Sequence, residues 1–232
     1  VEDKNLTLIN ASSASVYGLN KISKEEEKYE TPINHYAFTK LLVDQYVEQK
    51  LVKNPKLKII SLRFFNVYGF GEFSKGRMAS LPFKFFYKLK HGEPLLLFDK
   101  SNGCEAGEHS RDFIYVEDIL NVIEQSINKK INGIFNLGTG KNRSFNDLAL
   151  SCINAYYKIH KIDQQVNLNE ALAKGLIEYI EFPQDLKGKY QNFTKANMEK
   201  LSKNSIKIPA SSIEDGIFDY YSKMQNFWYN NT

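Results

Sequence analysis

Two stretches decide the fold of this chain: residues 6–18, LTLINASSASVYG, and residues 57–69, LKIISLRFFNVYG. The first begins with a short apolar run, 6–10, which small residues follow, and this pattern predicts a buried strand that ends in a tight turn. The second begins with the β-branched and apolar run 57–65. A run of this kind is typical of a strand covered on both faces, as in a parallel sheet.

A helix is predicted between these two strands. Over residues 34–50, Tyr36, Lys40, Val43 and Val47 recur at helical spacing, and Asn34 stands where a helix cap is expected. Strand, helix and strand in this order form a βαβ unit, so we expect an α/β fold with a parallel sheet.

The rest of the chain continues as mixed α/β structure. A polar insertion, residues 101–110, interrupts it. The pattern predicts strands over 95–98, 113–116, 134–137 and 177–182, and helices over 78–91, 117–128, from 144 onward, 168–174, 195–200 and 211–228.

Composition restricts the class of protein. Of the 232 residues, 42% are hydrophobic and 25% charged, which is the balance of a soluble globular protein. The net charge of +4 is small and the lysines are dispersed, so charge gives no reason to expect nucleic acid or a membrane as partner. No stretch approaches the roughly 18 apolar residues of a membrane span.

Metal and disulfide sites are not expected. The two cysteines, Cys104 and Cys152, form no C-x-x-C pair, and the four histidines share no metal-ligand spacing, so we assign no histidine a role. Unpaired cysteines fit a reducing compartment, and we expect a cytoplasmic location.

A serine, a tyrosine and a lysine form the first chemical constellation. Tyr36 and Lys40 are four residues apart and share one helical face, and Ser13 follows the first strand. A tyrosine has a pKa of about 10, and an adjacent ammonium group lowers such a value. The phenol could then take a proton from an alcohol, which the serine holds, while a nicotinamide ring takes the hydride from the same carbon.

A Y-x-x-x-K pair alone is weak evidence, because such pairs also occur on solvated helix faces. The context is more specific: S-S-A-S-V-Y-G over 12–18 precedes Tyr36, and R-F-F-N-V-Y-G over 63–69 follows it. With these three blocks in this order, the chain resembles the extended short-chain dehydrogenase/reductases that act on nucleotide sugars.

The resemblance narrows at residues 74–80, S-K-G-R-M-A-S, which are similar to a block of the ADP-L-glycero-D-manno-heptose 6-epimerases. It continues through 111–116, 133–140 and 186–194. It implies an NADP-dependent epimerase that inverts C6 of the heptose in ADP-D-glycero-D-manno-heptose, by transient oxidation to a ketone, for lipopolysaccharide core synthesis. Another nucleotide-sugar 4-epimerase, a 4,6-dehydratase and a non-catalytic remnant stay open as alternatives.

The resemblance also implies a fold and a division into domains. We expect the C-terminal part of a doubly wound Rossmann-type parallel sheet, with a smaller mixed α/β substrate domain. Residues 1–75 would be the second half of the dinucleotide-binding domain. Residues 76–232 would mainly bind substrate, with segments near 113–150 returning to the first domain. The whole enzyme is expected to be a homo-oligomer.

Catalytic and cofactor roles follow by position in the family. Tyr36 and Lys75 resemble the two proton acceptors, Ser13 assists, and Lys40 bridges to the cofactor ribose. Val67 matches a further position that contacts the cofactor, so Tyr36, Lys40, Val67 and Lys75 would bind NADP.

Substrate contacts are implied in the same way, and Arg111 and Tyr190 match the residues that grip the ADP diphosphate. Arginine suits this role because its planar donors meet phosphate oxygens in pairs. Two positions depart from the family: Arg77 replaces a small residue, and Lys84 stands where some members have histidine. The implied substrate-binding residues are Asn66, Arg77, Lys84, Phe98, Asp99, Lys100, Ser101, Arg111 and Tyr190.

A phosphate-binding glycine-rich turn is missing from these residues. Gly69-x-Gly71 and Gly138-x-Gly140 lack the third glycine at the required offset, and both are better explained as turns. The chain begins with Val1, so we expect it to be a piece of a longer protein whose preceding segment carries that turn. Alone, the piece is expected to bind NADP weakly or not at all, and to be inactive.

Overall fold

The computed structural model describes residues 6–101 and 103–229. Its central feature is a three-stranded parallel sheet in the order β1 (Thr7–Ser13), β2 (Lys58–Phe64) and β7 (Gly133–Leu137). Ser13 pairs with Phe64, and Phe64 pairs with Leu137, so the three strands end side by side at one edge of the sheet. We call this the carboxyl edge.

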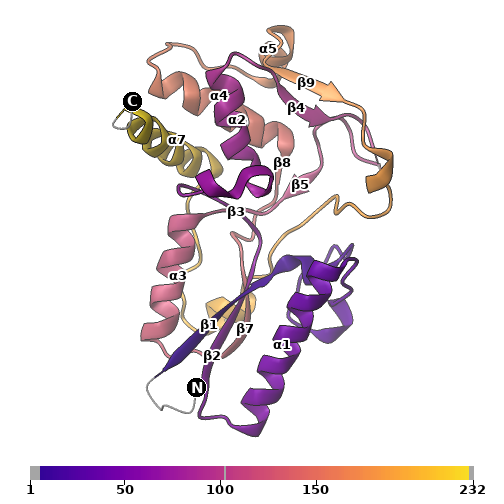
Figure 1. Ribbon diagram of the computed structural model, residues 1–232, viewed down its shortest axis with the longest axis vertical. Coiled ribbons are helices and arrows are strands. Elements are labelled where there is room, and N and C mark those ends of the chain that lie inside the picture. Colours follow the sequence, from indigo (N-terminus) through magenta and orange to yellow (C-terminus); the bar gives the residue numbers. More distant parts are fainter. Residues whose placement is uncertain (1–5, 102, 230–232) are drawn as a thin grey trace.

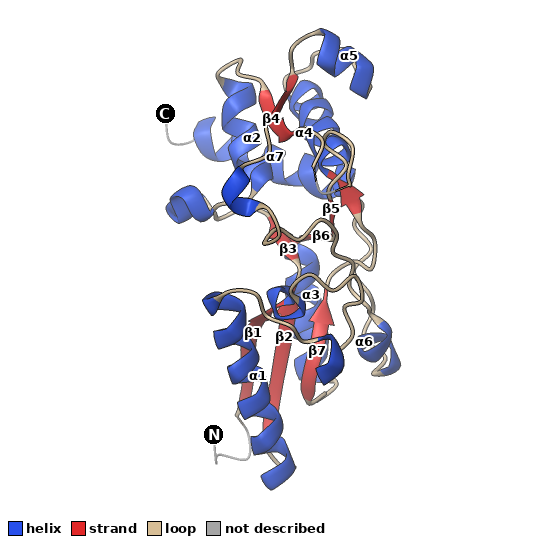
Figure 2. Cartoon of the chain, turned by 90° about the vertical axis from the view of Figure 1, so that its right-hand side faces the viewer, coloured by secondary structure: helices blue, strands red, loops and turns tan. Residues whose placement is uncertain are grey.

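Helices cover both faces of this sheet. Helix α1 (His35–Lys53) lies on one face and α3 (Val116–Asn128) on the other (Figures 1 and 2). The Asn34 side chain caps α1 by accepting a hydrogen bond of 2.8 Å from the backbone N–H of Ala37. Because α1 runs antiparallel to β1 and β2, its first turn lies at the carboxyl edge (Figure 1).

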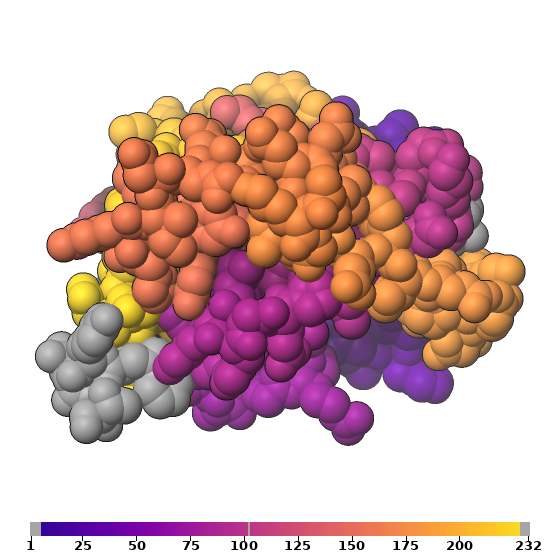
Figure 3. Space-filling view, turned by 90° about the horizontal axis from the view of Figure 1, so that it is seen from above, coloured from indigo at the N-terminus to yellow at the C-terminus, as the bar shows by residue number. Residues whose placement is uncertain are grey.

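A second group of elements lies beyond the carboxyl edge (Figure 1). There β4 (Leu95–Phe98) and β9 (Ile177–Ile180) form a parallel pair. Figure 3 shows the molecule from this end, where orange segments from the later part of the chain lie next to purple segments from its first half. The elements of this group are α2 (Leu81–Lys90), β4 (Leu95–Phe98), α4 (Phe145–Ile159), α5 (Leu168–Ala173), β9 (Ile177–Ile180) and α7 (Ile213–Tyr229).

None of the helices in residues 6–101 and 103–229 has both the length and the apolar character to cross a membrane.

Two short strand pairs connect these groups: β3 (Asn66–Tyr68) with β6 (Phe113–Tyr115), and β5 (Ser110–Arg111) with β8 (Arg143–Ser144). Side chains alternate along β6, so Phe113 and Tyr115 belong to the hydrophobic cluster around α2, α4 and α7. Ile114 belongs to the cluster around the three-stranded sheet. Strand β6 therefore separates the two hydrophobic clusters.

Short helical segments complete the chain. Most lie in the connections between the elements named above. They are η1 (Ala14–Tyr17), η2 (Glu27–Tyr29), η3 (Phe73–Met78), η4 (Gln184–Leu186) and α6 (Glu199–Lys203).

The predicted α/β class with a parallel sheet is confirmed, whereas some boundaries were wrong. The first strand continues past residue 10 to Ser13, because its pairing with β2 extends that far. The helix predicted over 78–91 begins only at Leu81, after Ser80 caps it. The helix predicted over 195–200 begins at Glu199, because Ala196 is held in a bridge to Ser23. The division into domains at residue 75 stays a prediction.

Candidate active site

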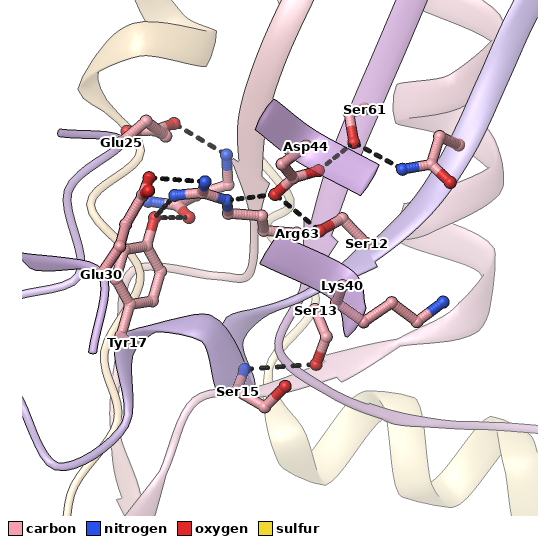
Figure 4. Close-up of polar contacts among 12 residues, drawn as sticks. Ser12, Ser13, Ser15, Tyr17, Glu25, Glu30, Lys40, Asp44, Ser61 and Arg63 are labelled. Carbon is pink, nitrogen blue, oxygen red and sulfur yellow. Dashed lines mark hydrogen bonds and ion pairs between the residues drawn. The ribbon is translucent and has the colours of Figure 1, made fainter. Parts of the chain in front are cut away.

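Ser13, Tyr36 and Lys40 lie at the carboxyl edge. Ser13 ends β1 and caps η1: its hydroxyl accepts a hydrogen bond of 3.2 Å from the backbone N–H of Ser15 (Figure 4). Lys40 Nζ donates a hydrogen bond of 2.7 Å to the carbonyl oxygen of Ala11 in β1. The same Nζ lies 5.7 Å from the centroid of the Tyr36 ring. The structure thus brings the ammonium group close to both the end of β1 and the phenol.

The Tyr36–Lys40 pair is distinguished by its location on α1, because a second pair on the same helix has a similar local geometry. Helix α1 carries a second Y-x-x-x-K pair, in which Lys50 Nζ lies 5.0 Å from the centroid of the Tyr46 ring. Tyr36 is 56% exposed and Tyr46 is 58% exposed. Only the first pair lies in the turn of α1 at the carboxyl edge, where a parallel α/β sheet binds its ligands.

Lys75 lies on η3, in the loop that follows β3. Its exposed side chain forms an ion pair of 3.5 Å with the carboxylate of Glu72. Glu72 is buried and also accepts hydrogen bonds from the backbone and hydroxyl of Ser80 (2.9 and 2.6 Å) and from the Tyr220 hydroxyl (3.2 Å). Among the described residues no hydrogen bond or ion pair joins Lys75 to Tyr36, so the two-base arrangement stays a prediction.

The other predicted substrate and cofactor residues in this region are spread along the chain from β3 to α2. The Lys84 ammonium donates a hydrogen bond of 3.0 Å to the carbonyl of Arg77, and both side chains are exposed. Asn66, also exposed, begins β3, where its backbone N–H donates to the carbonyl of Asp112 (3.0 Å). Val67 follows it, half-buried, in register with Ile114.

Arg111 and Tyr190 form a second group. Arg111 is only 6% exposed, and its guanidinium carbon lies 4.8 Å from the centroid of the Tyr190 ring. Burial lowers the pKa of the Arg111 guanidinium, because it disfavours the charged form. No carboxylate in the described part of the chain forms an ion pair with Arg111. A buried cation without a protein counter-ion suits an anionic ligand such as a diphosphate.

His109, which sequence reasoning left without a role, lies within this second group. Its Nε2 atom is 3.1 Å from the hydroxyl of Ser101, and its ring centroid is 5.4 Å from that of Tyr190. Phe98 also contacts the Tyr190 ring, with centroids 5.8 Å apart. No periodic pattern could reveal His109, because it meets Tyr190 only through the tertiary fold.

Asp99 and Lys100 lie between Phe98 and Ser101, but their side chains do not reach the group around Tyr190. Both are exposed: the Asp99 carboxylate accepts a hydrogen bond of 2.7 Å from the backbone N–H of Lys100, and the Lys100 ammonium pairs with Glu105 (2.6 Å). Within the predicted substrate run, only Phe98 and Ser101 therefore contact the group around Tyr190.

The loop that carries Tyr190 also reaches the turn after β1. Gln191 donates a side-chain hydrogen bond to the carbonyl of Gly18. Gly18 has a φ of 56°, and a Cβ there would lie 1.9 Å from the carbonyl oxygen of Thr31, so only glycine fits. A cavity of about 210 Å³ lies between this turn and the loop, lined by Leu19, Lys21, Gly188, Tyr190, Asn192 and Phe193.

A parallel sheet covered by helices, with a Y-x-x-x-K pair at its carboxyl edge, defines a class of dinucleotide-dependent enzymes. The chain belongs to the NAD dependent epimerase/dehydratase family, which its residues 1–138 match. It is 38% identical over 224 residues to the ADP-L-glycero-D-manno-heptose-6-epimerase of Thiobacillus denitrificans, a match that covers 96% of this chain and 67% of that protein. The resemblance to heptose 6-epimerases is thereby confirmed.

Solved structures agree on the fold. The crystal structure of Helicobacter pylori ADP-L-glycero-D-manno-heptose-6-epimerase has a TM-score of 0.72 at 27% identity, and the match covers 95% of this chain and 60% of that one. A UDP-N-acetylglucosamine 4-epimerase from Methanobrevibacter ruminantium, in complex with UDP-N-acetylmuramic acid, has a TM-score of 0.73 at 24% identity, with 95% and 63% covered. This chain thus spans less than two thirds of the length of either structure.

Family membership implies a nicotinamide dinucleotide, and the residues at the carboxyl edge fit one end of it. An ammonium group has three donors, and Lys40 directs one of them at Ala11, so two remain for the hydroxyls of a ribose. Tyr36 stands exposed beside it. The phosphates need a glycine-rich turn, and no G-x-x-G-x-x-G occurs in the 232 residues.

Proposed function

We propose that the protein containing this chain is an NADP-dependent epimerase that inverts C6 of the heptose in ADP-D-glycero-D-manno-heptose, and that it serves lipopolysaccharide core synthesis. The observation that carries the proposal is that the Lys40 ammonium lies close both to the Tyr36 ring and to Ala11, two residues before Ser13, at the carboxyl edge. The 38% identity to a heptose 6-epimerase and the block over 74–80 support the choice of sugar.

The residues at the edge would handle the proton of the reacting alcohol. Ser13 would hold the oxygen of the C6 hydroxyl and Tyr36 would take its proton, while Lys40, beside the Tyr36 ring, would bridge to the cofactor ribose. A bound nicotinamide supplies the acceptor and donor of hydride. Inversion requires the hydride to return to the opposite face of C6, and Lys75, on a separate loop, would then exchange the proton from that other side.

The second group would bind the nucleotide part of the substrate. Arg111 offers a buried charge that no carboxylate among residues 6–101 and 103–229 pairs with, and it would pair with the diphosphate oxygens. Tyr190 lies against the guanidinium and limits its rotation, so the donors are positioned before the ligand arrives.

The fold alone does not identify the sugar substrate, because the chain is equally similar in structure to a heptose 6-epimerase (TM-score 0.72) and to a UDP-N-acetylglucosamine 4-epimerase (TM-score 0.73). The test is to incubate the intact protein, loaded with NADP or with NAD, with ADP-D-glycero-D-manno-heptose, UDP-glucose and dTDP-glucose, and to separate the products by chromatography. We expect conversion of the ADP-heptose to its 6-epimer, fastest with NADP. Turnover of a UDP- or dTDP-sugar alone, or no turnover at all, would refute the proposal.

A further inference from the structure

An ion pair is buried beneath the carboxyl edge. Asp44 is 0% exposed and Arg63 is 1% exposed, and Arg63 Nε donates a hydrogen bond of 2.8 Å to the Asp44 carboxylate (Figure 4). Burying two charges is costly, and apolar residues of similar volume are often as stabilising as such a pair. A contribution to stability is therefore a weak explanation for this buried pair. Its other hydrogen bonds indicate that it positions the surrounding elements.

The Asp44 carboxylate joins three elements of the fold. Asp44 belongs to α1, and it accepts hydrogen bonds from the hydroxyls of Ser12 in β1 (2.8 Å) and Ser61 in β2 (2.6 Å). Ser61 in turn accepts from the Asn10 side chain (2.8 Å). These contacts hold α1 at one height above β1 and β2 (Figure 4).

The Arg63 guanidinium reaches the segments on the other side. It donates to the Tyr17 hydroxyl (3.0 Å) and to the carboxylate of Glu30 (2.6 Å), and Tyr17 donates to the side chain of Asn136 in β7 (2.6 Å). Burial by itself would lower the pKa of Arg63, but Tyr17 and Asp44 raise that pKa above its ordinary value. The guanidinium therefore stays charged and keeps all these partners.

We infer that the Asp44–Arg63 pair is a positioning device that fixes Ser13, Tyr36 and Lys40 relative to one another. Asp44 lies one helical turn after Lys40 and shares its face of α1. Its partner Ser12 precedes Ser13 directly. The inference rests on the proposed function, because it assigns the pair to the geometry of that same site.

The other end of the network supports the same role. Tyr17 ends η1, the turn that the Ser13 hydroxyl caps, and Glu30 lies in the segment that leads into α1. Arg63 thus fixes the exit of β1 and the approach to α1 at once. Among the residues that the structure describes, neither Asp44 nor Arg63 forms a hydrogen bond or ion pair with Tyr36 or Lys40, so the pair would act through the backbone and not on the substrate.

The experiment compares Asp44→Asn, Ser12→Ala and the double variant in the intact protein. Displacing reacting groups by roughly 1 Å costs about a hundredfold in rate, so we expect kcat of Asp44→Asn to fall about tenfold to a hundredfold, with KM changed less than about threefold. Ser12→Ala should cost less. The double variant should equal Asp44→Asn, because both changes break the same link.

A control separates positioning from stability. Ile153→Ala, in the hydrophobic cluster around α4, should lower the melting temperature at least as much as Asp44→Asn while it leaves kcat unchanged. An unchanged kcat in Asp44→Asn would overturn the inference. An equal loss of kcat in Ile153→Ala, or strictly additive losses in the double variant, would overturn it too.

The inference can fail independently of the proposed function. If the parent protein turns over none of the three sugars, the proposed function fails. Amide hydrogen exchange then tests whether the Asp44–Arg63 pair positions the residues at the carboxyl edge. Faster exchange confined to residues 12–15 and 36–41 in Asp44→Asn, absent in Ile153→Ala, supports the positioning role. Exchange that is unchanged, or faster throughout the sheet, contradicts it.

Discussion

Lys40 Nζ lies 2.7 Å from the carbonyl oxygen of Ala11, and this hydrogen bond ties the first turns of α1 to the end of β1. The matching lysine of the second Y-x-x-x-K pair, Lys50, makes no hydrogen bond to the sheet among the described residues. A side chain with four methylenes has many rotamers in solution, and the bond to Ala11 restricts Lys40 to the carboxyl edge. The ammonium is thereby held where the proposed reaction needs it.

Replacing Tyr36 by phenylalanine should abolish most turnover and leave the fold intact. The change removes one exposed hydroxyl that has no hydrogen bond in the described part of the chain, so the free energy of unfolding should change by less than about 0.5 kcal/mol. Loss of a general base typically costs about 10²- to 10⁴-fold in rate. Steady-state kinetics and urea unfolding measure the two effects. Tyr46→Phe, on the same helix and equally exposed, is the matched control, and equal rates in the two variants would contradict the role of Tyr36.

Replacing Lys75 by alanine should likewise stop epimerisation at little cost in stability. The Lys75 ammonium is exposed to solvent, which screens its attraction to the buried Glu72, and Glu72 keeps its hydrogen bonds from Ser80, so we expect the free energy of unfolding to fall by only about 1 kcal/mol. Product formation is measured by chromatography and unfolding by urea titration. Lys88→Ala, which breaks the surface ion pair with Glu93, is the control and should retain full activity. Full activity in Lys75→Ala would remove the two-base scheme.

Replacing Arg111 by methionine should weaken the binding of ADP without destabilising the fold. The guanidinium is buried with no carboxylate partner in the described residues, so removing its charge also removes a desolvation cost. Hydrogen bonds to charged groups contribute about 1.5–3 kcal/mol, so the Kd for ADP should rise at least about tenfold in titration calorimetry. Arg143→Met, which loses partners at Asp147 and Glu214, is the contrast: it should leave ADP affinity unchanged.

His109 should make the stability of the protein sensitive to mild acid. Burial and the nearby Arg111 lower its pKa below the ordinary value of 6.5. Between this lowered pKa and 6.5 the unfolded chain therefore binds more protons than the folded one, so the free energy of unfolding should fall as the pH drops through this range. Urea unfolding from about pH 8 to about pH 5 measures this slope. His109→Gln should flatten it, whereas His91→Gln, at an exposed position, should not; identical slopes for His109→Gln and the parent would refute the assignment.

Local order could be predicted from the sequence because neighbouring residues determine it. The apolar run over 57–65 and the cap at Asn34 predict β2 and the start of α1 from residues that are neighbours in the sequence. The chain order of strand, helix and strand then predicted a parallel sheet, and β1 and β2 do pair in parallel. Motif resemblance supplied the family, which the comparisons confirm.

Tertiary structure alone decided which distant side chains meet. Two Y-x-x-x-K pairs look equivalent along α1, and only the packing of α1 against β1 places Lys40 beside Ala11. The burial of Arg63 against Asp44 likewise depends on how α1 packs on the sheet. Such contacts are non-local, because residues far apart in the chain come together only when strands pair and helices dock, and a short sequence window holds no information about either.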